Sequence, residues 1–402
     1  MAAAGVRLRL KRLGLASVDE RLEAGVRLDF EDGVRLFACP DLLALGWLAN
    51  RERERRHGKR TYYNFNIRLE ATNVCVASCL FCSFARLKPG DPGSYTMSLE
   101  QVWDKLRSRA HQPLTEIHVV NGLHPDLPFE YYTDMLRGFK RIRPSIHLKC
   151  FTAVEIAFFA DLYGKTDEQV LVELQEAGLD SLPGGGAEIF AERVRRKIAH
   201  DKCDADRYLS IHRLAHGLGL RTNITMLYGH IETAEDRVDH MMRTRALQDE
   251  TRGLQAFIPL AFHPDNNQMR KLPAPSGDET LRVLAVSRLM LDNVPHIKGF
   301  WIATGVDMAQ LSLWFGVSDL DGTVQEERIY HMAGSDTPEA MSTIAIRRLI
   351  RAAGREPVER DTLYNVVTGP EVAESTLEVD SRESAVDSLS PVVTSPSRQS
   401  GV

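Results

Sequence analysis

The chain has 402 residues, of which 43% are hydrophobic and 26% charged, and its 50 Lys and Arg against 55 Asp and Glu give a formal net charge of −5 at pH 7. This length suits one large α/β barrel with additions, or two ordinary domains. The acidic balance excludes the basic excess of a dedicated nucleic-acid binder, and no apolar run approaches the roughly 18–20 residues that span a bilayer, so we expect neither nucleic acid nor a membrane as a partner.

Residues 1–60 look helical and charged, and residues 51–56 form a solvated charged run. The first 13 residues are rich in Arg and Lys but lack the apolar core of a secretory signal. A mitochondrial transit peptide is the alternative for this acid-free stretch, although acids follow from Asp19 onward. Six cysteines are too few for a disulfide scaffold of this length, so we expect a cytoplasmic protein in a reducing compartment.

From Tyr62 onward, short apolar or β-branched runs alternate with helical patterns. The expected strands are Phe65–Glu70, Glu116–Asn121, His147–Phe151, Asp180–Leu182, Arg221–Leu227, Gln255–Pro259, Ile297–Ile302 and a short one near Val317–Leu320. The expected helices are Leu99–Ala110, Phe129–Ile142, Asp167–Ala177, Asp206–Leu218, Ala234–Asp249, Asp278–Asp292 and Asp307–Trp314. Eight strands with intervening helices predict a β/α barrel of the TIM type, in which polar groups at the carboxyl ends of the strands form the site. A doubly wound open sheet is the alternative.

The expected organisation is an N-terminal helical extension (1–60), the β/α barrel (61–322), a C-terminal cap (323–368) and a tail (369–402). From residue 371 the tail is rich in Ser, Val, Glu and Pro and has no aromatic residue. Such a segment buries little apolar surface, so we expect it to be disordered.

Three cysteines, Cys75, Cys79 and Cys82, follow the first expected strand in a C-x3-C-x2-C pattern, with Phe81 before the last of them. Three thiolates on one loop can bind three irons of a [4Fe–4S] cluster, for which a full set is four ligands. The open iron can chelate the amino and carboxylate groups of S-adenosylmethionine, and one electron then cleaves the sulfonium to a 5′-deoxyadenosyl radical.

A zinc knuckle is the alternative for this loop, with His118 or His124 as the fourth ligand. The position of the loop after a first barrel strand favours the cluster. The other three cysteines, Cys39, Cys150 and Cys203, are expected to be ordinary thiols.

The cysteine segment resembles the radical S-adenosylmethionine superfamily. Further segments, between about Tyr62 and Asn365, resemble its branch in the futalosine pathway of menaquinone biosynthesis, and most of all the aminofutalosine synthases: residues 121–126, 151–156, 182–190, 226–233, 257–264 and 321–324. One departure is Asn121, where the family commonly has Gly, near the expected amino group of S-adenosylmethionine. Backbone carbonyls should still accept that group.

The resemblance implies that S-adenosylmethionine, as co-substrate, and 3-[(1-carboxyvinyl)oxy]benzoate give 6-amino-6-deoxyfutalosine, methionine and bicarbonate or CO2. The adenosyl radical adds to the enol-ether double bond, and a reductant such as flavodoxin or ferredoxin supplies the electron. The alternatives are the neighbouring cyclase, which acts on dehypoxanthine futalosine, and a zinc-binding module without catalysis.

The expected cofactor-binding residues are Phe81, Asn121, Gly122, Glu155, Glu188 and Arg195. Glu155 either faces the barrel mouth or caps a helix. Glu188 either accepts hydrogen bonds from a ribose diol or is an acid favoured at the start of a helix. Arg195, seven residues later, either pairs with a carboxylate or lies at the surface.

The expected substrate carries two carboxylates, so its site needs cations or hydrogen-bond donors. The candidates are Gly185, Tyr228, His230, Arg86 and Arg221. Gly185 belongs to a glycine triplet after the fourth expected strand, where the backbone can approach a ligand closely. A His at the end of a barrel strand can also move a proton, although a lone His is more often structural.

Overall fold

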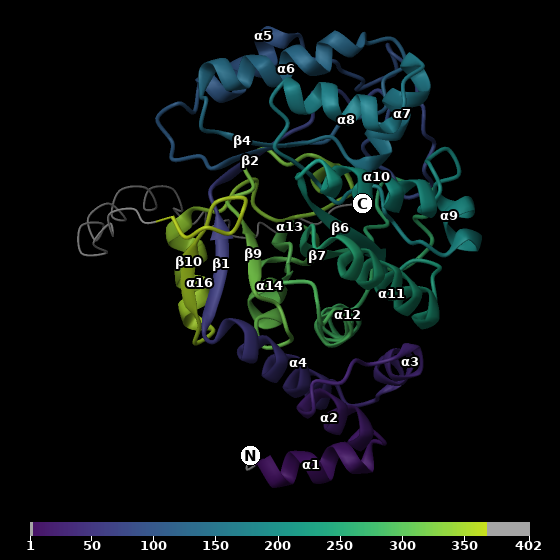
Figure 1. Cartoon of the computed structure of the whole chain (residues 1–402), viewed down its shortest axis with the longest axis vertical. Helices are drawn as coiled ribbons and strands as arrows, with labels where there is room; N and C mark the ends of the chain where they lie inside the picture. The colour runs from purple at the N-terminus through teal and green to yellow at the C-terminus, as the bar shows by residue number, and fades with distance from the viewer. Residues whose placement is uncertain (1–2, 368–402) are drawn as a thin grey trace, which may run out of the picture. The chain divides into compact units, whose positions relative to one another are not determined.

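The structure, a computed structural model, describes residues 3–367 (Figure 1). The N-terminal region is helical, as expected, and comprises α1 (Ala3–Arg12), α2 (Ala16–Glu23), α3 (Phe30–Ala38) and α4 (Leu42–His57). Side-chain caps fix two of these starts: Asp29 accepts a hydrogen bond from the Asp32 backbone N–H, and Asp41 from that of Ala44. Such caps satisfy amides that a helix start leaves without partners.

A parallel sheet of seven strands follows. Its strands are β2 (Asn66–Leu69), β3 (Glu116–Val119), β4 (His147–Cys150), β5 (Ser181–Leu182), β6 (Arg221–Tyr228), β7 (Leu254–Ala261) and β8 (His296–Ile297). They lie side by side in chain order. A doubly wound sheet reverses its strand order at a switch point. The sequential order therefore excludes that alternative and confirms the β/α barrel, in a partial form.

A second, three-stranded sheet lies across the remaining gap of the barrel. In it β1 (Arg60–Asn64) pairs with β9 (Asp319–Gly322) on one side and with β10 (Glu356–Glu359) on the other. Isolated bridges join the two sheets: Lys298, after β8, pairs with Asp319, and Gln325, after β9, pairs with Ile67 of β2. The strand expected near residues 317–320 is thus the link that completes the barrel wall.

The remaining helices lie around the barrel, and most of them cover its outer face. They are α5 (Leu99–Arg107), α6 (Phe129–Ile142), α7 (Ala153–Tyr163), α8 (Asp167–Glu176), α9 (Glu192–Ile198), α10 (Ala205–Gly217), α11 (Ala234–Thr251), α12 (Gly277–Met290), α13 (Trp301–Thr304), α14 (Val306–Ser312), α15 (Ile329–Met332) and α16 (Thr343–Ala352). In Figure 1, α5 to α8 cover one side of the sheet and α10 to α12 the next. The N-terminal helices rest on this layer, because α3 contacts α11 and α4 contacts α12.

Strand register arranges the polar side chains of the lumen in rows. Arg68, His118, Lys149 and Ser181 are successive partners across β2, β3, β4 and β5. Residues in register on neighbouring strands point to the same face, and side chains two positions apart along a strand share that face. Glu116 therefore belongs to the row below, farther from the carboxyl ends of the strands, where a barrel carries its site.

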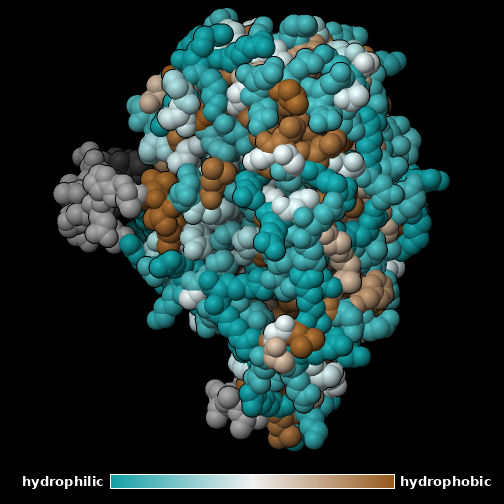
Figure 2. Space-filling view, viewed as in Figure 1, coloured by the Kyte–Doolittle hydropathy of each residue, from teal (hydrophilic) through white to brown (hydrophobic). Residues whose placement is uncertain are grey.

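The described residues form one compact unit that ends at Val367, and the expected tail of residues 369–402 lies outside them. The boundaries expected at residues 60 and 322 stay predictions. The face seen in Figure 2 is largely hydrophilic, with separate hydrophobic patches. Among the described helices, none has the length and apolar character needed to cross a bilayer.

Candidate active site

A cavity at the carboxyl ends of the strands contains the residues of the cysteine motif. Cys75, Cys79, Phe81 and Cys82 all line it. So do residues after β3, β4 and β5, which lie far from the motif in the sequence. The cavity therefore lies at the carboxyl ends of the strands, where we expected the site of a β/α barrel.

Backbone hydrogen bonds hold the cysteine loop in shape. The Cys75 N–H donates to the Arg86 carbonyl at 2.8 Å, and the Cys82 N–H donates to the Cys79 carbonyl at 3.1 Å. The Ala85 N–H donates to the Cys82 sulfur at 3.3 Å. A donor of this kind stabilises negative charge on a ligating sulfur, and hydrogen bonds to sulfur also tune the potential of an iron–sulfur cluster.

The cysteine geometry fits a [4Fe–4S] cluster better than one zinc ion. Nowhere in residues 3–367 do three His, Cys, Asp or Glu side chains converge to hold a single metal ion. A zinc site needs four donors at roughly 2.0–2.3 Å from one point, whereas a cube offers each thiolate an iron of its own. The zinc alternative needed His118 or His124, but His118 contacts Arg68, and His124 Nδ1 accepts the Asp126 N–H at 3.1 Å.

Burial keeps two of these thiols protonated until a metal binds. It raises the pKa of Cys75, and it raises the pKa of Cys79 to about 12. Metal binding must displace those protons, because the thiolate is the ligand. Burial by itself therefore favours the neutral thiols of Cys75 and Cys79.

Asn121 and Gly122, directly after β3, form the wall beside the cysteine loop. The Gly122 N–H donates to the Thr72 carbonyl at 2.9 Å, and a Cβ at Gly122 would lie 2.2 Å from the Val74 carbonyl oxygen. The Asn121 Oδ1 accepts the Ala71 N–H at 2.8 Å, while its Nδ2 is buried and has no partner among the described residues. The side chain that replaces the usual Gly thus anchors the loop and leaves one amide donor free.

Glu155 fills both roles that the sequence left open. It lines the cavity and is also the third residue of α7, where it completes a capping box with Thr152. Its carboxylate accepts the Thr152 N–H at 2.7 Å and the Asn121 N–H at 3.0 Å. Burial raises the pKa of Glu155 to about 7, although both hydrogen bonds act in the opposite direction.

Glu188 lies in the loop between β5 and α9, four residues before the helix, with a φ of +49°. The interpretation as an acid at a helix start is therefore wrong. Its carboxylate pairs with Lys202 Nζ at 2.6 Å, and both side chains line the cavity with Gly185. Lys202 Nζ also lies 5.4 Å from the centroid of the Phe81 ring. Lys202 was not predicted from the sequence.

Two arginines that were expected to contact the ligands donate their hydrogen bonds to backbone carbonyls instead. The Arg195 guanidinium donates to the carbonyls of Ala187 and Cys203, both at 2.6 Å. The Arg86 guanidinium donates to carbonyls of its own loop, among them that of Ala85 at 3.0 Å. Neither side chain is part of the cavity lining, so both hold loops in place and the expected carboxylate contacts gain no support.

Three substrate candidates also lie outside the cavity lining. The Tyr228 hydroxyl is buried and donates to Thr280 at 3.1 Å. The His230 Nδ1 lies 2.9 Å from the Glu232 carboxylate, and neither side chain is exposed. Arg221 begins β6, so it lies at the end of the barrel opposite the mouth, where it is exposed.

Several cavity residues carry charge that the sequence analysis did not single out. They are Arg68, Lys149, Lys298 and Asp321. A signal for two of them was available, because Arg68 and Lys149 interrupt short apolar strands, as in Asn-Ile-Arg-Leu and His-Leu-Lys-Cys. A charged side chain inside a buried strand is uncommon unless it is paired or functional.

Comparison with known proteins agrees with this geometry. The Radical SAM superfamily model matches residues 69–243, and the CofH/MqnC C-terminal region model matches residues 251–373. An aminodeoxyfutalosine synthase of Thermus thermophilus is 50% identical over 88% of this chain and 96% of its own length. One of Streptomyces coelicolor is 45% identical over 89% and 95%.

Two further matches have lower sequence identity. A cyclic dehypoxanthine futalosine synthase of Halalkalibacterium halodurans is 34% identical over 88% of this chain and 95% of its own length. The crystal structure of methylornithine synthase covers 84% of this chain and 96% of its own, with a TM-score of 0.67 and 16% identity, which supports the fold alone. The chain belongs to the radical S-adenosylmethionine superfamily and, within it, to the CofH/MqnC family.

Proposed function

We propose that the protein is an aminodeoxyfutalosine synthase. It joins the adenosyl group of S-adenosylmethionine to 3-[(1-carboxyvinyl)oxy]benzoate and yields 6-amino-6-deoxyfutalosine, methionine and bicarbonate or CO2. The observation that carries the proposal is one cavity that combines three cysteine sulfurs with a buried polar wall, in a chain 50% identical to such a synthase.

Cys75, Cys79 and Cys82 would hold the cluster. A [4Fe–4S] cluster bound there supplies the electron that divides S-adenosylmethionine into methionine and a 5′-deoxyadenosyl radical. The protein's task is to position the two substrates and to keep water out.

The polar wall offers the groups that a nucleoside needs. The free amide donor of Asn121 is buried beside the cysteine loop. The Glu188 carboxylate, beside Lys202, can accept hydrogen bonds from the two ribose hydroxyls. Gly184 and Gly185 bring bare backbone to the same cavity, and a Cβ at Gly184 would lie 2.8 Å from the Asn223 backbone. These residues would grip S-adenosylmethionine.

The product identifies the reaction. Reconstituted protein is incubated without oxygen with dithionite, S-adenosylmethionine and the enolpyruvyl benzoate, and mass spectrometry follows the adenosyl group. We expect about four irons per chain and an adduct that retains that group, in line with four irons in the cube. A parallel incubation replaces the enolpyruvyl benzoate by dehypoxanthine futalosine. Release of 5′-deoxyadenosine with turnover there, and no adduct with the benzoate, would assign the cyclase reaction and contradict the proposal.

The proposed reaction requires a one-electron donor and a compartment in which thiols stay reduced. We propose a flavodoxin or ferredoxin as the physiological donor, and the cytoplasm as the compartment, because the cluster needs reduced thiols. All six cysteines are free in the structure. Replacing dithionite by a flavodoxin with its reductase should sustain turnover, and failure with both protein donors would contradict this part.

A further inference from the structure

Three charged side chains form a group in the lumen, below the mouth of the cavity. Lys298 Nζ lies 2.7 Å from one oxygen of Asp321, and the Arg68 guanidinium donates to the other. All three residues line the cavity, and we call them the lumenal triad. We propose that Arg68 and Lys298 of the triad bind the ring carboxylate of the enolpyruvyl benzoate, an inference that rests on the proposed function.

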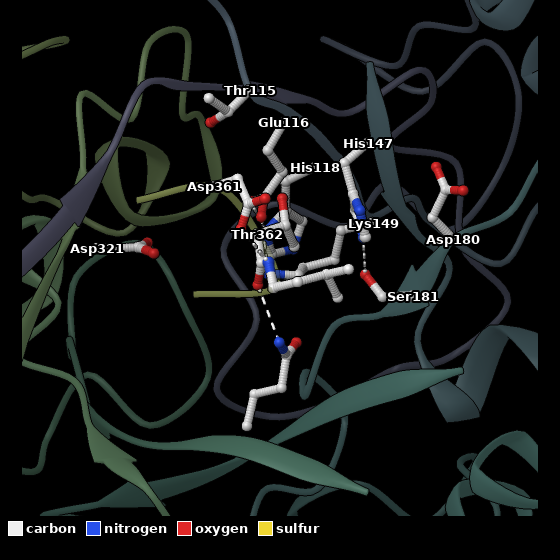
Figure 3. A network of polar contacts seen from close by, with 12 residues as sticks. Thr115, Glu116, His118, His147, Lys149, Asp180, Ser181, Asp321, Asp361 and Thr362 are labelled. Carbon is white, nitrogen blue, oxygen red and sulfur yellow. Dashed lines mark hydrogen bonds and ion pairs between the residues drawn. The ribbon is translucent and has the colours of Figure 1, made fainter. Parts of the chain in front are cut away.

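The triad has one cation more than it has anions. Asp321 is shared by Arg68 and Lys298, whose charges lower its pKa even though burial alone would raise it. The neighbouring cation Lys149 has an acid of its own, since its Nζ lies 2.8 Å from Glu116. Figure 3 shows Glu116 and Lys149 close together, with Asp321 to one side. A buried charge in excess is costly, so the triad favours an added anion.

Other titratable groups around the triad do not remove this excess. Burial and the charge of Arg68 lower the pKa of His118, so its ring stays neutral. Burial and the charge of Glu327 raise the pKa of Glu70, which favours its neutral form. Glu327 has other partners, because it accepts the Tyr330 N–H at 2.9 Å and lies 3.2 Å from the ring of His331.

Donors of the triad also remain available. The Arg68 Nε is buried and has no partner among the described residues. The Lys298 ammonium can donate three hydrogen bonds. Among residues 3–367 it donates only to Asp321. A carboxylate can accept several such bonds at once, and bonds between charged groups are the stronger ones.

Apolar side chains next to the triad suit an aromatic ring. The Arg68 guanidinium lies 5.3 Å from the centroid of the Phe300 ring. Phe300, Ile258, Leu260 and Phe262 line the same cavity. Cations beside a wall of aromatic and branched side chains are complementary to an aryl carboxylate, which has a charged end and an apolar body.

The register of the strands orients the substrate. Arg68 lies in the row of His118 and Lys149, inside the barrel, whereas the cysteine loop begins beyond the end of β2. The ring carboxylate lies at the far end of the substrate from the enol carbon that receives the adenosyl group. Binding that carboxylate in the lumen therefore directs the enol toward the cysteines.

The test compares two ligands in the wild type and in variants of the triad. The second ligand is 2-phenoxyprop-2-enoate, which keeps the enol ether and lacks the ring carboxylate. Dissociation constants of both are measured with cluster-loaded protein and S-adenosylmethionine but no reductant. We expect the wild type to prefer the full substrate about ten- to hundredfold, as for hydrogen bonds to a charged group. In Lys298→Met and in Arg68→Gln this preference should fall below about threefold, with affinity for 2-phenoxyprop-2-enoate retained.

The control is Arg213→Gln, which removes an exposed cation on α10 that pairs with Glu250 at 2.6 Å. It should keep the wild-type preference. Either triad variant is a sufficient test of the inference, provided that its iron content and circular dichroism match the wild type. Lys298→Arg, which keeps a cation at this position, should keep most of the preference for the full substrate. A full preference in the folded triad variants would overturn the inference while the proposed function stands. A wild type that makes no adenosyl adduct would overturn both.

Discussion

The carboxylate of Glu155 accepts a hydrogen bond from the backbone N–H of Asn121 at 3.0 Å. This contact joins the first turn of α7 to the residue that follows β3, so two walls of the cavity are fixed against each other. The same carboxylate caps α7. One buried acid thus serves both the helix and the site.

The stability of the protein should depend on the protonation of Glu155. Its folded pKa is about 7, above the ordinary 4.5, so the folded state holds the proton more tightly than the unfolded state does. Stability from this group is therefore full below about pH 4.5 and is lost as the pH rises through 7. The loss is roughly 3 kcal/mol. Urea unfolding of wild type and Glu155→Gln across this range measures it: the free energy of unfolding of the wild type should fall by that amount relative to the variant, which cannot ionise, as the pH rises from about 4.5 to above 7. A constant difference between the two proteins would contradict the assignment.

Gly122 is a position where only glycine fits. In Gly122→Ala the added Cβ would lie 2.2 Å from the Val74 carbonyl oxygen, so the cysteine loop must shift. We expect a loss of about 1–3 kcal/mol in the free energy of unfolding and less bound iron after reconstitution. Gly217→Ala is the control, because no atom lies within 4 Å of its new Cβ, and this change at the last residue of α10 should not lower the stability. Equal iron content in the two variants would show that the loop tolerates the shift.

Cys79→Ser should leave the barrel folded and remove the cluster. Serine has nearly the shape of cysteine but is a poor ligand for iron, and two thiolates are too few to hold the cube. Iron content and the methionine formed on reduction should both fall to background, with unchanged circular dichroism. Cys203→Ser makes the same change in a thiol outside the cavity lining and should behave as wild type. Full methionine release by Cys79→Ser would remove the cluster interpretation.

Glu188→Gln separates cofactor binding from pairing with Lys202. If the carboxylate binds the ribose, the dissociation constant for S-adenosylmethionine should rise about ten- to hundredfold, since a hydrogen bond to a charged group contributes about 1.5–3 kcal/mol. The variant also leaves half-buried Lys202 without its acid, so the melting temperature should fall as well. A lower melting temperature with an unchanged dissociation constant would mean that Glu188 serves Lys202 alone.

Local patterns in the sequence were enough to predict most elements. The expected helix at residues 99–110 begins where Ser98 and Gln101 form a capping box, which is a signal within four residues. By contrast, α7 was missed, because Ala153–Tyr163 is buried on nearly all sides and shows no alternation of apolar and polar faces. Residues 301–302 were expected in a strand and form α13, since a short apolar run does not distinguish the two.

The residues of the candidate site also differ in whether a local sequence pattern could identify them. The cysteine motif is local, so its three cysteines could be singled out from their spacing as cluster ligands, and all three line one cavity. The lumenal triad joins β2, the end of β8 and β9, and its members meet only through strand register. No spacing along the chain encodes that meeting. Arg86 and Arg195 gain no support as ligand candidates, because the sequence does not tell whether a guanidinium faces a cavity or the carbonyls of a loop.

During synthesis β1 is made long before β10, the strand with which it pairs at one edge. Tyr63 of β1 donates a hydrogen bond to Glu359 of β10 at 3.1 Å, across 296 residues of sequence. At roughly 5–20 residues per second, a ribosome takes about 15–60 s to deliver the partner. Throughout that interval one edge of β1 has no strand to pair with, and unpaired edges promote association between chains. The edge of β1 is therefore open to association with other chains until β10 has been made.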